Sequence, residues 1–311
     1  MLNRRILRIK AFKILYAYAE NPALTLKEAL KQLACSCEAT QDLYLYMLGI
    51  VAPLTQEAAL RIEAARGKFN PTEEERNPNL KFARNALAPL LAEDIDLQKL
   101  LEKKKLSWEQ QDAFLYKLYA TIRTKDYFRA YMENPGTSLE EDVALFIRIF
   151  EEEFEDSPEL ASILEDMSIW WNDDLAYALN LCCQSLEKLA KGGRWTLPPL
   201  YKSTADADFV TKLLTAAMSG YGRYSEMVAS HTSDWEQDRL FATDVALIAM
   251  GLAEAVTFPE IPVKVTINEY VEISKFYSTP RSRSFVNGLL DKLIGEMGAE
   301  GLVVKSGRGL L

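Results

Sequence analysis

The sequence holds a single histidine, His231, among its 311 residues, and this scarcity removes several kinds of active site. A Ser-His-Asp triad would have to use His231, whose surroundings, HTSD, are typical of a capped helix boundary instead. The chain also lacks a Walker phosphate loop and a Gly-rich dinucleotide loop. These absences argue against an enzyme, and we expect neither catalytic residues nor a cofactor.

Metal-binding patterns are missing as well. The four cysteines, Cys35, Cys37, Cys182 and Cys183, form CSC and CC pairs, whose spacings do not match zinc sites. The acidic run at 151–156 favours a solvated helix face, because a hard cation needs convergent oxygens rather than a run. We therefore expect no metal and, without a secretory signal, reduced and mostly buried thiols in a cytoplasmic protein.

Long apolar runs are also absent. No stretch of about 18 uncharged apolar residues occurs, which argues against a membrane span. The N-terminus is basic, but Lys10 and Lys13 interrupt any apolar core of a signal peptide. An Arg-rich start without acids also resembles an organelle transit peptide, although a folded amphipathic first helix is favoured.

Acidic residues are abundant but unevenly placed. The net charge is −9, yet the segment from Glu140 to Asp174 alone holds thirteen acids and one base, Arg148. The remainder of the chain therefore sums to +3. The whole-chain charge says little about nucleic-acid binding, and local patches decide the question.

The hydrophobic pattern is helical almost throughout and predicts an all-α protein. Near the N-terminus one helical face is formed by Leu7, Ala11, Ile14, Leu15 and Tyr18. Breakers divide the chain at Asn21-Pro22, in a linker-like loop at 67–79 and most strongly at 192–207, which combines Gly-Gly with Pro-Pro. Pro262 predicts the start of a helix. Gly288 predicts a close approach of another element, and the last thirteen residues predict a flexible tail.

Two segments carry basic residues with no acid among them. Residues 1–19 hold five basic side chains, and TPRSRS at 279–284 holds two arginines beside Tyr277 and Phe285. An ordinary solvated surface explains such charges. Arginine next to aromatic rings also suits single-stranded RNA, in which guanidinium groups meet phosphates and rings stack on splayed bases.

These same segments resemble the NusB family of bacterial transcription antitermination factors. RRILRIKAFKILYAY at 4–18 is similar to the family's Arg-rich opening helix, and PVKVTINEYVEISKFYSTPRSRSFVNGLLDK at 262–292 is similar to its INE…FVNG.LD signature. Residues 208–256 resemble the family's middle helices. The likeness covers roughly residues 1–20 and 205–297, and typical members are about half as long as this chain.

The resemblance implies a NusB-like pair of small helical bundles, discontinuous in sequence. We expect residues 1–20 and 205–311 to form this RNA-binding core, and residues 21–204 to be an inserted all-helical region of unknown role. The family's function implies an RNA-binding antitermination factor that acts on boxA-type RNA of ribosomal transcripts. Its partners would be the NusE ribosomal protein and the RNA polymerase antitermination complex.

Site residues carry over from the family's motifs. Arg4, Arg5 and Arg8 would contact RNA phosphates, and the second edge of the same site would be lined by Arg281, Arg283, Phe285 and Asn287. Tyr16, Glu269 and Glu272 are candidates for the NusE-facing surface. The family often has an acid in the loop before FVNG, where this chain has only TPRSRS. That difference strengthens backbone contacts and puts the family's boxA selectivity in doubt.

Two other functions compete with this one. NusB-like domains also precede some RNA cytosine methyltransferases, but only 23 residues follow Gly288, too few for a cofactor domain. The alternative is a protein-interaction scaffold built on a NusB-like core, in which Glu140–Asp174 docks a basic partner. A face that merely keeps the protein in solution explains the acidic segment equally well.

Overall fold

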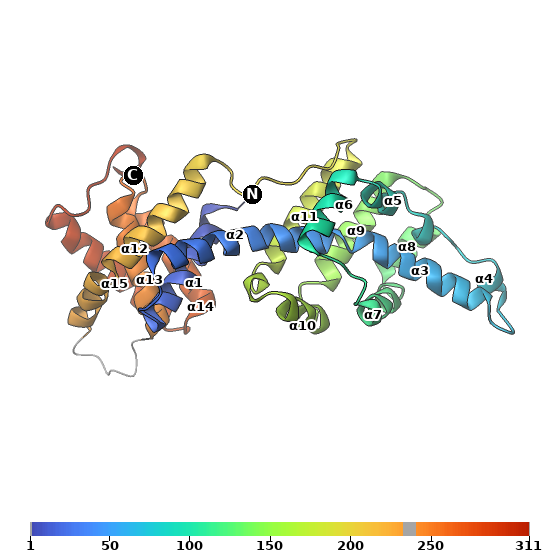
Figure 1. Ribbon diagram of the computed structural model, residues 1–311, viewed down its shortest axis with the longest axis horizontal. Coiled ribbons are helices and arrows are strands. Elements are labelled where there is room, and N and C mark those ends of the chain that lie inside the picture. The colour runs from blue at the N-terminus through green and yellow to red at the C-terminus, as the bar shows by residue number, and fades with distance from the viewer. Residues whose placement is uncertain (1, 233–240, 311) are drawn as a thin grey trace. The chain divides into compact units, whose positions relative to one another are not determined.

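The computed structural model describes residues 2–232 and 241–310, and within them the chain is helical, as the sequence predicts (Figure 1). No strand occurs in the described part of the chain, where one isolated parallel bridge joins Leu2 to Tyr201. Two compact units divide the chain. The terminal unit comprises Met1–Cys37 and Pro199–Leu311, and the middle unit comprises Glu38–Pro198. The division expected at residues 20 and 204 stays a prediction.

The terminal unit surrounds one almost wholly buried helix, α13, in which every residue from Asp244 to Ala255 is buried. Helices α1, α12, α14 and α15 all contact it. Residues 233–240, part of the stretch expected to be helical, lie outside the described residues. The helices of this unit, with the first part of α2 (Leu26–Leu48), are α1 (Arg4–Glu20), α12 (Thr204–His231), α13 (Ala242–Thr257), α14 (Val263–Tyr277), α15 (Ser282–Ala299) and the 3-10 turn η4 (Gly307–Leu310).

Local sequence explains where these helices begin and end. The Asn3 side chain accepts a hydrogen bond from the Ile6 amide and starts α1, and Asn21 ends it, as predicted. Pro262 precedes the first residue of α14, which confirms the predicted helix entry. These boundaries give α1 and α14 the lengths that bring their polar residues together.

Two predictions about glycine and the tail are wrong. Gly288 is exposed and has nothing within 4 Å of a would-be side chain, whereas a methyl group on Gly251 would lie 2.6 Å from Leu290 of α15. The close approach is therefore on α13. The tail is held as well, because Lys305 Nζ donates to the carbonyls of Ala255 and Phe258, and the Ser306 amide donates to Pro259.

The middle unit is a helical assembly with an aromatic centre. The Tyr46 ring stacks on Trp108, at 4.3 Å between centroids, and on Trp171, at 5.4 Å. Its elements, after the rest of α2, are α3 (Val51–Arg66), α4 (Glu73–Arg76), η1 (Phe82–Arg84), α5 (Leu87–Ala92), α6 (Ile95–Lys104), α7 (Asp112–Ile122), α8 (Asp126–Glu133), α9 (Leu139–Glu153), α10 (Pro158–Met167), η2 (Ile169–Trp171) and α11 (Leu175–Ala190). The predicted loop at 67–79 contains α4, which begins with a capping box of Thr72 and Glu75.

One helical stretch of the described residues, Leu26–Arg66, is long and apolar enough to cross a membrane by length and composition. Of its most apolar window, 67% is buried inside the protein, as in the core helix of a soluble domain. This stretch is weak support for a membrane span.

Candidate nucleic-acid interface

The first two arginines of α1 are paired with acids from distant parts of the sequence. Arg4 Nε lies 2.9 Å from Asp206 Oδ1 at the start of α12. Arg5 donates two hydrogen bonds to Glu269 of α14, at 3.0 and 2.8 Å. These two arginines are therefore neutralised in part, because the fold supplies the acids that the local sequence lacks.

Arg8 is buried in the core of the terminal unit. Its guanidinium makes a two-pronged contact with Glu254 of α13, at 2.7 and 2.9 Å, and both side chains are almost fully shielded from solvent. Thr266 and Tyr270 of α14 also donate to the Glu254 carboxylate. Burial alone lowers the pKa of the Arg8 guanidinium, but the hydrogen bonds and charge of Glu254 outweigh burial and hold the pKa above its ordinary value.

The lysines of α1 are engaged too. Lys10 is buried, and its Nζ donates to the Ser36 carbonyl at 2.8 Å. Lys13 Nζ lies 5.6 Å from the centre of the Tyr277 ring. The basic pattern of residues 1–19 thus largely serves to join α1 to its neighbours.

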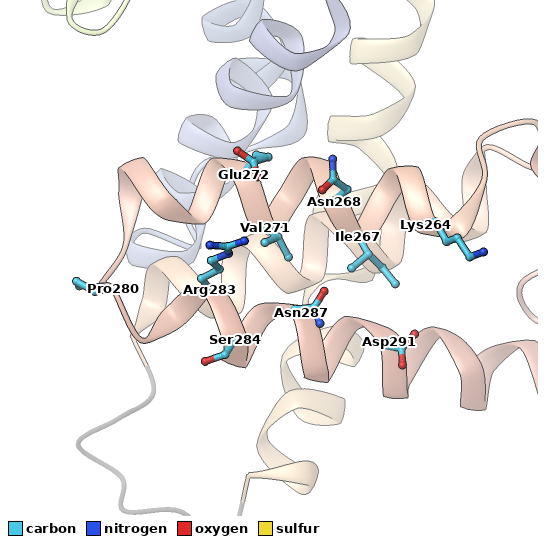
Figure 2. Close-up of a pocket in the computed structure, with 10 residues that line it drawn as sticks. All are labelled: Lys264, Ile267, Asn268, Val271, Glu272, Pro280, Arg283, Ser284, Asn287 and Asp291. Carbon is cyan, nitrogen blue, oxygen red and sulfur yellow. The ribbon is translucent and has the colours of Figure 1, made fainter.

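A groove runs between α14 and α15, with a volume of about 670 Å³. Figure 2 shows Arg283 reaching from α15 toward α14, with Asn287 one turn further along. The groove is polar at both ends, because Lys264 and Asp291 lie at one end and Glu272 and Arg283 at the other. Its lining residues are Lys264, Ile267, Asn268, Val271, Glu272, Pro280, Arg283, Ser284, Asn287 and Asp291.

The start of α15 holds Arg281 and Arg283 on a fixed backbone. Ser282, 2% exposed, donates to Asp244 Oδ2 at 2.7 Å and accepts a hydrogen bond from Ser278. Arg281 and Arg283, on either side of it, are exposed and form no ion pair with any described residue. The buried serine thus fixes the backbone between two exposed arginines that form no ion pair within the described residues.

The aromatic residues around this loop are placed unequally. Phe276 is 81% exposed at the end of α14, whereas Tyr277 packs edge-on against Phe12 at 5.5 Å and Phe285 is half-buried. Sequence reasoning named Tyr277 and Phe285 and missed Phe276. The helical pattern held the signal, because Phe276 falls off the buried face that includes Tyr270 and Ile273.

The residues expected to face a protein partner are dispersed. Tyr16 is half-buried beside Phe12, Glu269 is held by Arg5, and Glu272 lines the groove. A hydrogen bond from Lys275 lowers the pKa of Glu272, and the charges of Arg5 and Arg283 lower it further. Glu272 and Arg283 line the same groove, so a residue assigned to the protein partner lies beside one assigned to RNA.

Redox and metal chemistry find little support. The described residues contain no group of three or more His, Cys, Asp or Glu side chains placed to hold a metal. None of the four cysteines, all of which lie in the described part of the chain, forms a disulfide. Burial raises the pKa of Cys183 to about 11 and that of Cys182 well above its ordinary value, so these two thiols stay protonated and unreactive.

Comparison with known proteins finds a family likeness in the C-terminal part of the chain. The NusB family model matches residues 187–295. The transcription antitermination protein NusB of Salinibacter ruber is 36% identical over 113 residues, which cover 36% of this chain and 71% of that protein. The NusB proteins of Chloroherpeton thalassium and Natranaerobius thermophilus are 35% and 27% identical, and the chain spans 63% and 64% of their lengths. No solved structure matches the chain.

Proposed function

The chain belongs to the NusB family, and on that premise we propose that it is a transcription antitermination factor that binds boxA-type RNA. The proposed target is the ribosomal RNA transcript, and the NusE ribosomal protein binds it together with this chain in the RNA polymerase antitermination complex. The proposed site of action is the cytoplasm. Support comes from the relatives' printed name, transcription antitermination protein.

One observation carries the proposal: Arg281 and Arg283 are exposed and unpaired among the described residues, beside a groove and next to an exposed Phe276. Lys275 pairs with Glu272, whereas Lys264, at the other end of the groove, is also exposed and forms no ion pair with a described residue. Unpaired guanidinium groups bind phosphates without first giving up a carboxylate, and an exposed ring stacks on any base. This combination suits single-stranded RNA better than duplex.

Each side chain has a proposed part. Arg281 and Arg283 bind the RNA backbone, Phe276 and Phe285 stack on bases, and Asn287 hydrogen-bonds to a base edge within the groove. Arg4 and Arg5, which are partly exposed, join when RNA phosphates compete with their carboxylates. Arg8 supports the site from inside, because its guanidinium is only 4% exposed.

The NusE-facing surface is proposed to include Tyr16, Glu269 and Glu272. Glu272 borders the RNA groove, so NusE bound there would contact both the protein and the RNA. This arrangement predicts that NusE tightens RNA binding, because the partner covers carboxylates that otherwise repel phosphates.

The test is binding of a labelled boxA-like RNA at two salt concentrations, with and without NusE. We expect binding to weaken as salt rises and to tighten with NusE. In Arg281→Ala/Arg283→Ala the dependence of log affinity on log salt should become shallower by about 0.7 for each lost phosphate contact. Phe276→Ala should cost about 1–3 kcal/mol of binding with an unchanged salt slope.

A matched control is Lys99→Ala/Lys103→Ala, which removes two exposed positive charges from α6 of the middle unit. This variant should bind RNA with the parent's affinity and slope. If both double variants lose affinity equally, binding is a diffuse charge effect and the assigned surface is wrong. If the folded protein binds no RNA under any condition, the scaffold alternative takes its place.

A further inference from the structure

The middle unit contains a second groove, of about 680 Å³, whose lining is apolar at its floor and acidic at its rim. Helices α3, α5, α6 and α7 form it, together with the end of α2 and the segment 106–109. Leu60, Leu101 and Trp108 are among the floor residues, and Leu60 is 58% exposed. A leucine exposed to this degree in an apolar groove offers surface area that a partner can bury.

The floor is rigid rather than loosely packed. Trp108 is 3% exposed, stacks on Tyr46 and on Phe114, and donates from its indole nitrogen to the Tyr46 carbonyl at 2.8 Å. A binding surface that is already held in place costs little conformational entropy when a ligand binds.

The charge at the rim is of one sign. Of the described residues that line the groove, the charged ones are Glu57, Glu102, Glu109 and Asp112. Arg61 pairs with Glu57 at 2.6 Å, but the other three carboxylates form no ion pair with a described residue. Lys99, Lys103 and Lys105 are neighbours in sequence and do not line the groove.

We propose that this groove docks an amphipathic helix of a protein partner, with an apolar face on the leucine floor and lysines or arginines toward the three free carboxylates. Helix-in-groove binding uses this combination of apolar anchors and flanking charge. A small apolar ligand would leave the three carboxylates without a positively charged partner. The chain's own basic amphipathic helix, α1, does not qualify, because Leu7, Arg8 and Lys10 are buried within the terminal unit.

This site is separate from the proposed RNA groove and from the acidic segment Glu140–Asp174. It gives the middle unit a function of its own, the recruitment of a basic protein segment. Failure of RNA binding leaves this proposal standing, and the reverse also holds.

The test uses the full chain and a designed peptide of roughly 18 residues, about 27 Å of helix. Leucines recur at every third and fourth position, lysines and arginines flank them, and one apolar position carries a photo-crosslinking residue. A second peptide replaces the basic residues with glutamate. Fluorescence anisotropy should show that the basic peptide binds and that the glutamate peptide does not. The crosslinks should map to α3, α6 or residues 106–109.

Two charge-reversal variants locate the site. Glu102→Lys/Glu109→Lys should weaken binding of the basic peptide about tenfold, because both residues lie at the rim. Glu151→Lys/Glu155→Lys makes the same change in charge at exposed positions of the acidic segment, and should change affinity less than about twofold. Circular dichroism checks that each variant is folded.

Several outcomes would overturn the proposal. Equal losses in the two variants would indicate unspecific charge attraction, and a larger loss in Glu151→Lys/Glu155→Lys would move the docking site to the acidic segment. Binding of the glutamate peptide, or no binding of the basic one, would remove the charge argument. If sedimentation shows a dimer that Leu60→Lys converts to monomers, the groove binds a second copy of this chain instead.

Discussion

The two units of the chain carry charge of opposite sign. The middle unit holds 29 acidic and 18 basic residues, a net −11, within a chain whose total is −9. The terminal unit is therefore left with +2, and two of its exposed arginines, Arg281 and Arg283, lie at the junction between α14 and α15. The same chain thus offers one surface that suits an anionic partner and a second surface that suits a cationic partner.

The units differ inside as well. In the terminal unit Arg8 pairs with Glu254, and both side chains are at most 4% exposed, whereas in the middle unit the buried Lys81 side chain pairs with Glu141, which is 31% exposed. In the middle unit, buried Asp142 accepts hydrogen bonds from the Tyr131 hydroxyl and the Ala86 amide, which are neutral donors. The terminal unit thus holds a fully shielded ion pair in its core, whereas the buried carboxylate of Asp142 in the middle unit is held by neutral donors.

Loss of the buried ion pair is the largest effect expected from this difference. Arg8→Ala leaves Glu254 buried with an uncompensated charge, and should lower the free energy of unfolding of the terminal unit by about 3–5 kcal/mol. Hydrogen exchange of the α13 and α14 amides measures this unit separately from the middle one.

Arg5→Ala is the matched control, since it removes an arginine of the same helix whose ion pair is half exposed. The expected loss is about 0–1 kcal/mol. Equal losses in the two variants would mean that Arg8 is no more structural than its neighbour, and the contrast between a surface and a core arginine would fail.

Sequence reasoning found the fold because helical periodicity and breakers are local signals. The face that includes Leu7, Ala11 and Leu15 is buried as expected, and Pro262 and Asn21 mark real helix boundaries. The NusB signature named Arg283 and Asn287 as site residues, and their role in RNA binding stays a prediction. These features depend on residues within one or two turns of each other.

Tertiary pairing was beyond sequence reasoning, because it joins residues far apart in the chain. Arg8 meets Glu254 across 246 positions and Arg5 meets Glu269 across 264, so an acid-free segment looked unneutralised. The role of Gly251 was hidden in the same way, since it depends on Leu290 of another helix. The groove of the middle unit is lined by five helices and has no motif.

The C-terminal tail offers the next largest test, now within the terminal unit. A methyl group on Gly309 would lie 1.9 Å from the Pro259 carbonyl oxygen, so Gly309→Ala must displace η4 from the start of α14. We expect the free energy of unfolding to fall by roughly 1–3 kcal/mol. Thermal melting followed by circular dichroism measures the change.

Gly288→Ala is the control for this substitution. Nothing lies within 4 Å of the added methyl group, and the position is inside α15. Alanine there should raise stability by about 0.5–1 kcal/mol, because glycine is the poorer helix former. A tail that does not pack would instead leave Gly309→Ala neutral.

The smallest effects are expected in the aromatic core of the middle unit, at two tyrosines two positions apart. The Tyr44 hydroxyl accepts from Trp195 Nε1 at 2.9 Å and bonds to Ser185 Oγ, whereas the Tyr46 hydroxyl has no hydrogen-bond partner among the described residues. Tyr44→Phe leaves two polar groups unpaired and should cost about 1–2 kcal/mol. Tyr46→Phe removes an unsatisfied buried hydroxyl and should leave stability unchanged or raise it by up to about 1 kcal/mol.

Urea unfolding followed by tryptophan fluorescence reports on this unit, since Trp108, Trp171 and Trp195 surround the two rings. A loss of equal size in both variants would show that the Tyr46 hydroxyl is bonded in solution, and that the middle unit relies on polar contacts in its core as the terminal unit does.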